Sequence, residues 1–248
     1  MTETSLLAVF LILCGAVAGS FLAAWADRLP RAESIVHPPS RCRTCDTRIG
    51  WHDLVPVASW LWLGGRCRTC GAEIPRRLFY AEIGGMGLAI LAVWGAQSPW
   101  HMVLGAFWLW LLMGLMMCDL AALRLPDALT GLLFLTGLGL AWEDPLRSVG
   151  DGVIGAALGA GAFWLIRICY RLLRKREGLG LGDVKLMAGI GAGLGVMPLP
   201  IVALIGATSA LIWSGLTSWQ SGHQPDAALE VPFGAHLAGA SALLWLIL

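Results

Sequence analysis

Long stretches of this chain carry no charged side chain, and this feature constrains its fold more than any other. The longest stretches cover residues 83–118 and 186–225, and shorter ones cover 5–26 and 231–248. A helix that crosses the hydrocarbon core of a bilayer needs only about 20 apolar residues. Hydrophobic residues make up 57% of the chain and charged residues 13%, whereas soluble domains contain roughly 25% charged residues. The sequence therefore predicts an all-α polytopic membrane protein and excludes a soluble monomer.

Turn-forming residues divide these stretches into about eight transmembrane helices. The first long stretch breaks at residues 97–101 and the second at 197–200, where prolines interrupt the helical pattern. The first apolar segment is a retained helix rather than a signal peptide, because no basic residue precedes it and its apolar run is too long. The predicted helices span residues 6–26, 78–96, 100–118, 126–142, 149–172, 184–196, 199–218 and 231–248.

The basic residues predict the orientation of these helices. Lys and Arg accumulate in cytoplasmic loops, and with the N-terminus outside every one of the 17 except Arg147 falls on the cytoplasmic side. The inverted topology would place the others outside. The polar loop between the first two helices is therefore expected in the cytoplasm. A net charge of +1 gives no indication of a nucleic-acid partner.

Two Cys-X-X-Cys pairs lie in this loop, one formed by Cys42 and Cys45 and the other by Cys67 and Cys70. Two pairs at this spacing favour a tetrahedral four-cysteine zinc site. The alternative is a pair of disulfides, which a reducing cytoplasm disfavours. Because the protein fills all four positions, the ion is predicted to be structural. We expect three parts: a first transmembrane helix (1–27), a zinc-binding loop (28–77) and the remaining helices (78–248).

Two aspartates, Asp119 and Asp183, lie at the edges of predicted helices on the same membrane face. Ionisable residues at such places are candidates for function. Two adjacent carboxylates share one proton, so that one can activate water while the other protonates a scissile carbonyl, as in an aspartic protease. The alternative interpretation of Asp183 is a carboxylate at the start of a helix that is stabilised by the helix macrodipole. Asp127 is a further acidic residue near Asp119, and for it we favour the interpretation as the N-cap of a helix. Sequence spacing alone leaves the contact between the two aspartates open.

Several motifs, taken together, resemble the prepilin peptidases, also called type IV leader peptidases, which are GxGD aspartic proteases of bacterial membranes. The resemblance covers nearly the whole chain and implies an endopeptidase of the bacterial inner membrane that cleaves the leaders of prepilin or pseudopilin precursors at the cytoplasmic face. It implies Asp119 and Asp183 as catalytic residues, and 78–248 as the peptidase domain. The motifs are Gly19-Ser20-Phe21-Leu22, the two cysteine pairs, Asp119 with Leu125-Pro126-Asp127, Gly180-Leu181-Gly182-Asp183-Val184-Lys185, and Pro232-Phe233-Gly234.

The resemblance also implies a second activity, N-methylation of the new N-terminus with S-adenosylmethionine, because the cysteine loop is typical of the bifunctional members. The chain departs from the family at Phe79-Tyr80, where the family commonly has Tyr-Pro, while Arg77 and Glu82 match. Ala121 replaces an often acidic position. No glycine-rich nucleotide motif indicates where S-adenosylmethionine binds.

Two other functions remain open from the sequence. One is an intramembrane aspartic protease similar to signal peptide peptidase, which also uses a GxGD helix but offers no reason for the cysteine loop. The other is a zinc-stabilised membrane scaffold or a proton-coupled transporter. The expected partners are prepilin-like precursors and the lipid bilayer. The GxxxG spacings, which begin at Gly15, Gly155 and Gly189, are expected to pack helices within one chain.

Overall fold

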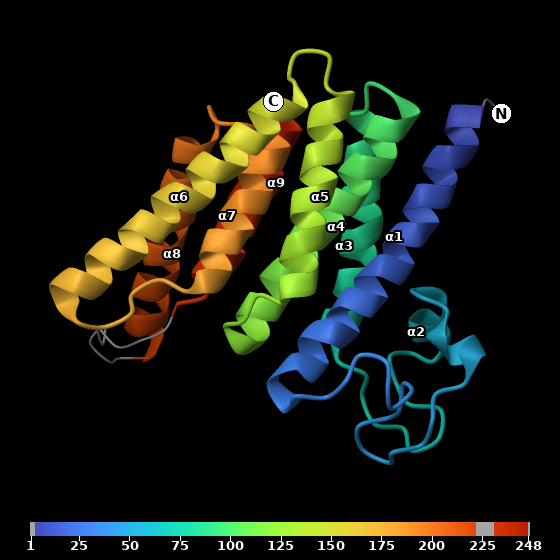
Figure 1. Cartoon of the computed structure of the whole chain (residues 1–248). Coiled ribbons are helices and arrows are strands. Elements are labelled where there is room, and N and C mark those ends of the chain that lie inside the picture. The colour runs from blue at the N-terminus through green and yellow to red at the C-terminus, as the bar shows by residue number, and fades with distance from the viewer. Residues whose placement is uncertain (1–2, 222–230, 248) are drawn as a thin grey trace.

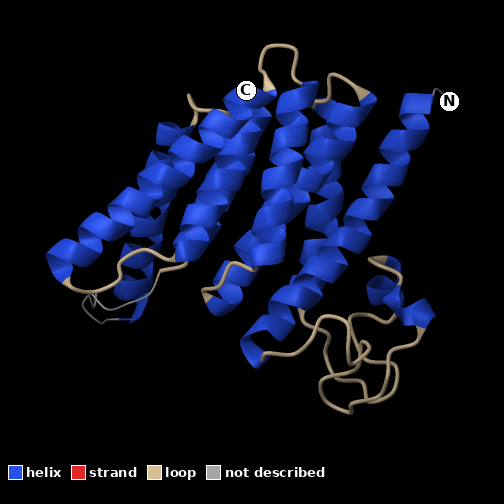
Figure 2. Ribbon diagram, in the orientation of Figure 1, coloured by secondary structure: helices blue, strands red, loops and turns tan. Residues whose placement is uncertain are grey.

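All regular structure in the described part of the chain, residues 3–221 and 231–247, is helical in the computed structural model (Figures 1 and 2). The longer helices run side by side as a bundle, and a loop-rich segment lies at one end of it. The elements are α1 (Glu3–Arg28), η1 (Leu29–Arg31), η2 (Trp51–Leu54), α2 (Ala58–Trp62), α3 (Arg76–Trp94), α4 (Pro99–Ala122), α5 (Asp127–Glu143), α6 (Val149–Arg174), α7 (Leu181–Leu194), α8 (Leu199–Ser221) and α9 (Phe233–Ile247).

The long helices correspond in position to the predicted segments. Among the described residues, α1, α3, α4, α6 and α8 are long and apolar enough to cross a membrane. Helices α5, α7 and α9 have 17, 14 and 15 residues, fewer than the about 20 of a full span. The prediction of a helical multi-pass membrane protein is confirmed, and the count of eight spans stays a prediction. The predicted end of the last helix, Leu248, lies outside the described residues.

Helix α4 lies at the centre of the bundle. It packs against α1, α3, α5 and α9, and its side chains Trp108, Leu109, Leu112 and Leu115 are at most 1% exposed. A helix that is apolar on all sides must be surrounded by other helices or lipid. Because its neighbours bury α4, the residues at its end are placed between helices rather than in lipid.

Glycines allow two pairs of helices to come into backbone contact. Between α1 and α3, a Cβ atom on Gly85 would lie 2.0 Å from the Gly15 carbonyl oxygen, and one on Gly19 would lie 2.1 Å from a carbonyl oxygen of α3. Between α6 and α7, a Cβ on Gly155 would lie 2.3 Å from the Gly191 carbonyl oxygen. These distances leave no room for a side chain, so the predicted role of the GxxxG spacings in packing helices within one chain is confirmed.

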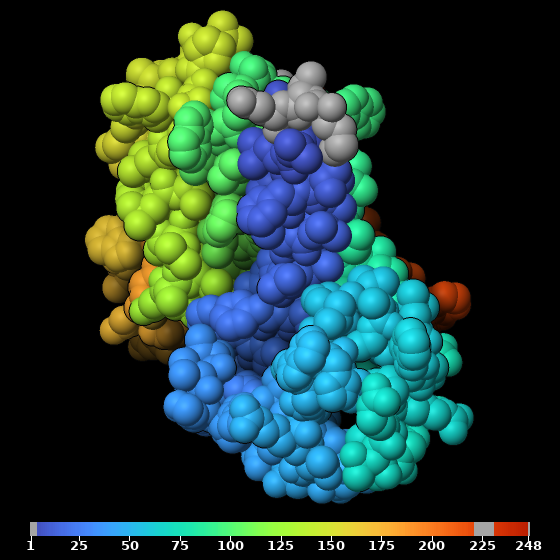
Figure 3. All heavy atoms as spheres, turned by 90° about the vertical axis from the view of Figure 1, so that its right-hand side faces the viewer, coloured from blue at the N-terminus to red at the C-terminus, as the bar shows by residue number. Residues whose placement is uncertain are grey.

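Residues 29–75 form a separate lobe at one end of the bundle, which we call the cysteine lobe. Figure 3 shows it next to the end of α1, below that helix in the view. Asp27, near the end of α1, pairs with Arg31, Arg43 and Arg77, which come from η1, the lobe and the start of α3. One carboxylate, only 12% exposed, therefore joins the lobe to α1 and α3.

We expect replacement of Gly85 by Ala to destabilise the protein by about 1–3 kcal/mol, because the added methyl group must push α1 and α3 apart. Gly87 lies on the same helix with nothing within 4 Å of a Cβ position, so Gly87→Ala is the matched control and should leave stability unchanged or slightly raised. Thermal unfolding of both variants in detergent measures the difference. Equal melting temperatures would contradict the close contact.

Candidate active site and metal centre

The four cysteines of the lobe meet in one cluster. Their sulfur atoms all lie within 4.8 Å of one another, and the Sγ atoms of Cys42 and Cys70, one from each pair, are 3.8 Å apart. All four cysteines are free thiols, and disulfide sulfurs would be about 2.05 Å apart. The structure therefore contradicts the disulfide alternative and brings together the four predicted ligands.

The two cysteine pairs have the same backbone geometry. The N–H of Asp46 donates to the Cys42 carbonyl, and the N–H of Gly71 donates to the Cys67 carbonyl, at 3.1 and 2.9 Å. Asp46 and Gly71 both have positive φ, 56° and 71°, a conformation that glycine adopts without cost. Gly71 therefore has the tight-turn role that its place after the second pair predicts.

The cluster has the donor set and spacing of a metal site. Thiolate ligands at about 2.3 Å from one tetrahedral ion lie about 3.8 Å from each other, which is the distance between Cys42 and Cys70. Hydrogen bonds with Thr47 lower the pKa of Cys45 to about 6, whereas hydrogen bonds with the neighbouring thiols raise that of Cys70 to about 12, so without a metal the cluster favours the thiolate at Cys45 and the thiol at Cys70. The four cysteines could thus hold a metal ion without rearrangement of the lobe.

Glu82 attaches the lobe to the bundle at a second point. It lies in α3 and is 9% exposed. One carboxylate oxygen accepts the hydroxyl of Ser20 in α1 at 2.8 Å, and the other accepts the N–H of Val57 in the lobe at 2.7 Å. Val57 has a φ of 63°, which is unfavourable for a β-branched residue. Glu82 therefore holds a strained turn of the lobe against the membrane helices.

Asp119 lies in the last turn of α4, where it is 6% exposed. The helix ends three residues later, and Leu123 at its C-cap has a left-handed conformation. The Asp119 carboxylate accepts the backbone N–H of Ala235 at 2.7 Å and is also hydrogen-bonded by the N–H of Gly234. Both donors belong to the first turn of α9, and Ala235 is 116 positions from Asp119 in the sequence.

Asp183 is the third residue of α7, which begins at Leu181 rather than at the predicted Val184. Its carboxylate accepts the N–H of Gly180 at 3.3 Å, and the residue is 9% exposed. A carboxylate in the first turn of a helix is stabilised by the free N–H groups and the macrodipole. Asp183 therefore has the helix-start role that the alternative interpretation gave it, and its position relative to Asp119 decides whether it has another.

The two carboxylates meet beside Gly234. A Cβ atom on Gly234 would lie 3.1 Å from Asp119 Oδ2 and 3.1 Å from Asp183 Oδ1, so the two oxygens lie within twice that distance of each other. Two like charges in such a buried site repel each other, which disfavours ionisation of both carboxylates at once. The structure thus brings together the two aspartates that the sequence analysis selected.

The expected N-cap role of Asp127 is wrong. Pro126 occupies the N-cap position of α5, and Asp127 is the first helical residue with no capping bond from its side chain. Its carboxylate instead accepts a hydrogen bond from Lys185 Nζ at 2.7 Å. This exposed ion pair connects the start of α5 to α7, so Lys185 is an electrostatic partner of Asp127.

The sequence analysis missed the backbone donors of Gly234 and Ala235. It noted Pro232-Phe233-Gly234 as a family element but assigned it no role. The available signal was a proline just before a helix start whose second and third residues are glycine and alanine, which leaves free N–H groups next to a position without a side chain. Nothing in the sequence indicated that Asp119 would be the acceptor.

Comparisons with known proteins give a consistent result. Residues 13–96 match the bacterial peptidase A24 N-terminal domain, and residues 106–215 match the type IV leader peptidase family. The chain is 36% identical to the prepilin leader peptidase/N-methyltransferase of Aeromonas hydrophila, over 86% of this chain and 73% of that protein. It is 33% identical to the enzyme of the same name from Dickeya chrysanthemi, over 94% and 90%. The type 4 prepilin-like proteins leader peptide-processing enzyme of Escherichia coli strain H10407 is 34% identical, over 86% and 77%. No solved structure matches the chain.

A helical bundle with two buried carboxylates at one end and a four-thiol lobe beside it defines a multi-pass membrane protein with an acidic site and a candidate metal centre. The four cysteines lie within the first matched region, and both aspartates lie within the second. With this similarity over most of its length, the chain belongs to the type IV leader peptidase family, and it is a peptidase.

Proposed function

We propose that this peptidase removes the leader peptides of prepilin-like precursors by aspartic catalysis at Asp119 and Asp183. The observation that carries the proposal is the approach of both carboxylates to the same point, 3.1 Å from each. One carboxylate deprotonates water and the other protonates the scissile carbonyl. The names of the similar enzymes indicate the substrates, which are precursors of pilins or of related pseudopilins.

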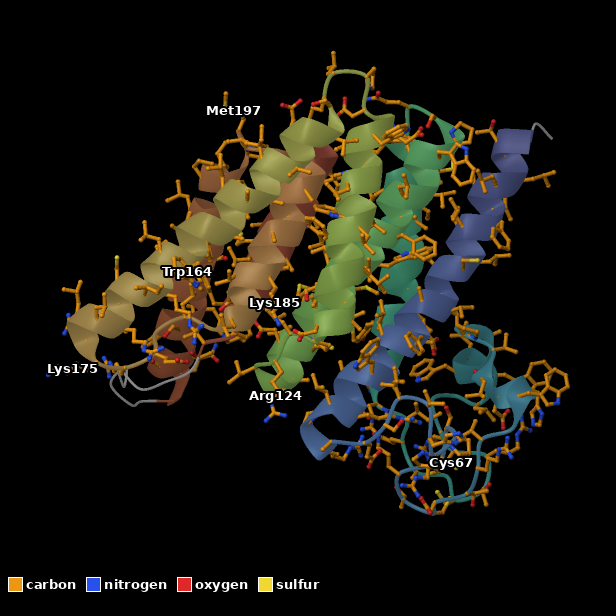
Figure 4. The ribbon with its side chains drawn as sticks, viewed as in Figure 1. Cys67, Arg124, Trp164, Lys175, Lys185 and Met197 are labelled. Atoms are coloured by element: carbon orange, nitrogen blue, oxygen red, sulfur yellow. The ribbon has the colours of Figure 1, made fainter. Side chains whose placement is uncertain are left out.

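The distribution of charge supports a location of this site at the cytoplasmic face of the bacterial inner membrane. Figure 4 shows Arg124, Lys175 and Lys185 at the same end of the bundle as Cys67, and Met197 at the opposite end. Arg147 lies at the opposite end as well, where its guanidinium donates to a carbonyl of the last turn of α7 at 2.8 Å. Because basic residues accumulate inside, the end with the lobe and the aspartates faces the cytoplasm.

Zinc is the metal that suits the cysteine lobe. Tetrahedral sites made of four thiolates are typical of structural zinc, which has no open coordination position for catalysis. Cys42, Cys45, Cys67 and Cys70 would hold the ion and thereby fix the fold of a lobe that has few regular elements. The role of zinc in this proposal is to stabilise the lobe.

A second reaction, N-methylation of the new N-terminus, is supported by the names of the relatives, which include N-methyltransferase. S-adenosylmethionine would supply the methyl group. A cavity of about 490 Å³ beside Cys67 is within the size range of small-ligand sites. Three of its four arginines are paired, Arg41 with Asp46, Arg43 with Asp27 and Arg68 with Asp53, which reduces its repulsion of a positively charged sulfonium group.

We expect Asp119→Asn and Asp183→Asn each to abolish leader cleavage, because an amide cannot exchange the proton that the reaction requires. Asp127→Asn is the matched control. It removes only an exposed ion pair, which is worth about 0–1 kcal/mol, and should retain most of the activity. Co-expression with a prepilin-like substrate, followed by mass measurement of its N-terminus, reads out cleavage and methylation together.

The same experiment separates the alternatives. Near-normal processing by either aspartate variant, at unchanged thermal stability, would show that Asp119 and Asp183 are not a catalytic pair. A cut within the apolar span of the substrate, rather than after its leader, would indicate an intramembrane protease of the signal peptide peptidase type. Loss of activity in Asp127→Asn with an intact fold would show that the wrong carboxylate had been chosen.

We expect one zinc ion per chain in the purified protein, and loss of that ion on replacement of Cys42 or Cys67 by Ser. The binding free energy of a structural zinc site is largely folding free energy, so each variant should lose the ordered lobe. Elemental analysis and limited proteolysis of the lobe measure the two effects. Cys169, an exposed cysteine in α6, provides the control, because Cys169→Ser should leave the zinc content unchanged. Stoichiometric zinc in the Cys42 or Cys67 variants would contradict the site.

A further inference from the structure

The first turn of α9 donates backbone N–H groups to the carboxylate of Asp119. The Ala235 N–H donates to Asp119 Oδ2 at 2.7 Å, and the Gly234 N–H is a second donor to the same carboxylate. The first N–H groups of a helix have no partner within it, and the helix dipole places positive potential there. The carboxylate of Asp119 supplies the missing acceptor, and α9 in turn stabilises the negative charge of that carboxylate.

Asp183 is held less strongly as an anion. It accepts one backbone N–H, from Gly180, at the longer distance of 3.3 Å. Its other oxygen, Oδ1, faces the Gly234 position together with Asp119 Oδ2. Hydrogen bonds from N–H groups favour the charged form of a carboxylate, so the site with two donors retains the negative charge when the pair shares one proton.

Resting on the proposed function, we infer that the Gly234–Ala235 turn is a positioning element of the catalytic site. Its two backbone N–H groups keep Asp119 ionised as the carboxylate that activates water, and leave the shared proton on Asp183. The sequence motif that received no role therefore determines which aspartate acts as the base.

Gly234 is required at this turn by the space available. A Cβ atom there would lie 2.9 Å from the side chain of Leu125 and 3.1 Å from each of the two carboxylates. These distances are shorter than ordinary van der Waals contacts of about 3.5–4.0 Å. A methyl group would separate the carboxylates from each other and from the N–H donors.

The reaction balances with this assignment. Asp119 takes a proton from water, the water oxygen bonds to the scissile carbonyl carbon, and the proton of Asp183 moves to the carbonyl oxygen. The resulting neutral gem-diol then collapses. Asp119 gives its proton to the leaving nitrogen, the C–N bond breaks, and a hydroxyl of the diol returns a proton to Asp183, which restores the starting state.

Other charged groups on the elements around Asp119 have partners elsewhere. Asp183 on α7 is the carboxylate that faces it, and Cys118 is its buried neighbour on α4. Four titratable groups on the surrounding elements are bonded to other residues: Asp127 of α5 to Lys185, Glu82 of α3 to Ser20 and Val57, Arg31 of η1 to Asp27, and His236 of α9 to Ser209. The pH dependence of the pair is thus governed by the two aspartates and their backbone donors.

The test removes one donor without removing a side chain of the dyad. Ala235 is the third residue of α9, and proline is tolerated in the first turn of a helix although it lacks an N–H. In the full-length protein in lipid vesicles, Ala235→Pro should lower kcat for leader cleavage by about 100-fold and change KM by less than about threefold. Unchanged kcat, at unchanged melting temperature, would overturn the inference.

The pH profile tests which aspartate is the base. If Asp119 must be ionised, loss of a donor makes it take up a proton at higher pH, so the acidic limb of the kcat/KM profile should move up by about one pH unit. If Asp119 were instead the acid, the same loss would move the basic limb upward and leave the acidic limb in place. That second result would overturn the assignment.

Gly234→Ala provides an independent variant with a matched control on the same helix. It should also lose about 100-fold in kcat. A Cβ on Gly239 would lie no closer than 4.0 Å to a neighbouring atom, so Gly239→Ala should keep normal kcat. Asp119→Asn and Asp183→Asn belong in the same assay. If they remain active, the proposed function fails. If they are inactive while Gly234→Ala and Ala235→Pro behave as Gly239→Ala does, only the inference about α9 fails.

Discussion

Two carboxylates buried next to each other are the constraint on which the rest of this structure depends. Removing an ion from water costs several kcal/mol in a real protein, and a second like charge nearby adds to this. The bundle meets the cost by bringing three helix ends to one place: the last turn of α4, the first turn of α7 and the first turn of α9. The helix starts supply N–H groups, and the glycine of α9 supplies the space.

The cysteine lobe depends on a different kind of interaction, between two acids of α1 and α3 and the groups around them. Asp27 forms ion pairs with arginines from three segments. Glu82, which lies in α3, joins this helix to α1 and the lobe through two hydrogen bonds. Both acids lie on membrane helices near the lobe. A lobe with few regular elements thus has four clustered cysteines at its centre and is held to the bundle at its edge by two carboxylates.

Local features of the sequence were sufficient to predict the helices and the cysteine cluster, and they selected Asp119 and Asp183 without showing that the two residues meet. Charge-free runs indicate where helices lie, and the spacing of two Cys-X-X-Cys pairs is typical of four ligands around one ion. The contact of Asp119 with Ala235 could not be predicted, because it joins residues 116 positions apart through a backbone group that any residue except proline would carry. The prediction for Asp127 was wrong for a related reason. Its position directly after Pro126 fits an N-cap, and only the tertiary structure brings Lys185 to it.

The short length of α7 has a consequence for the depth at which Asp183 lies. Its 14 residues rise about 21 Å, roughly 9 Å less than the hydrocarbon core of a bilayer. In a bilayer, at least one end of α7 would therefore lie below the membrane surface, and the charge of Arg147 lies at one of these ends, with Asp183 at the other. In terms of hydrophobic mismatch, the protein and not the lipid would provide the polar groups at that depth, so the thickness of the bilayer would help to determine how easily water reaches Asp183.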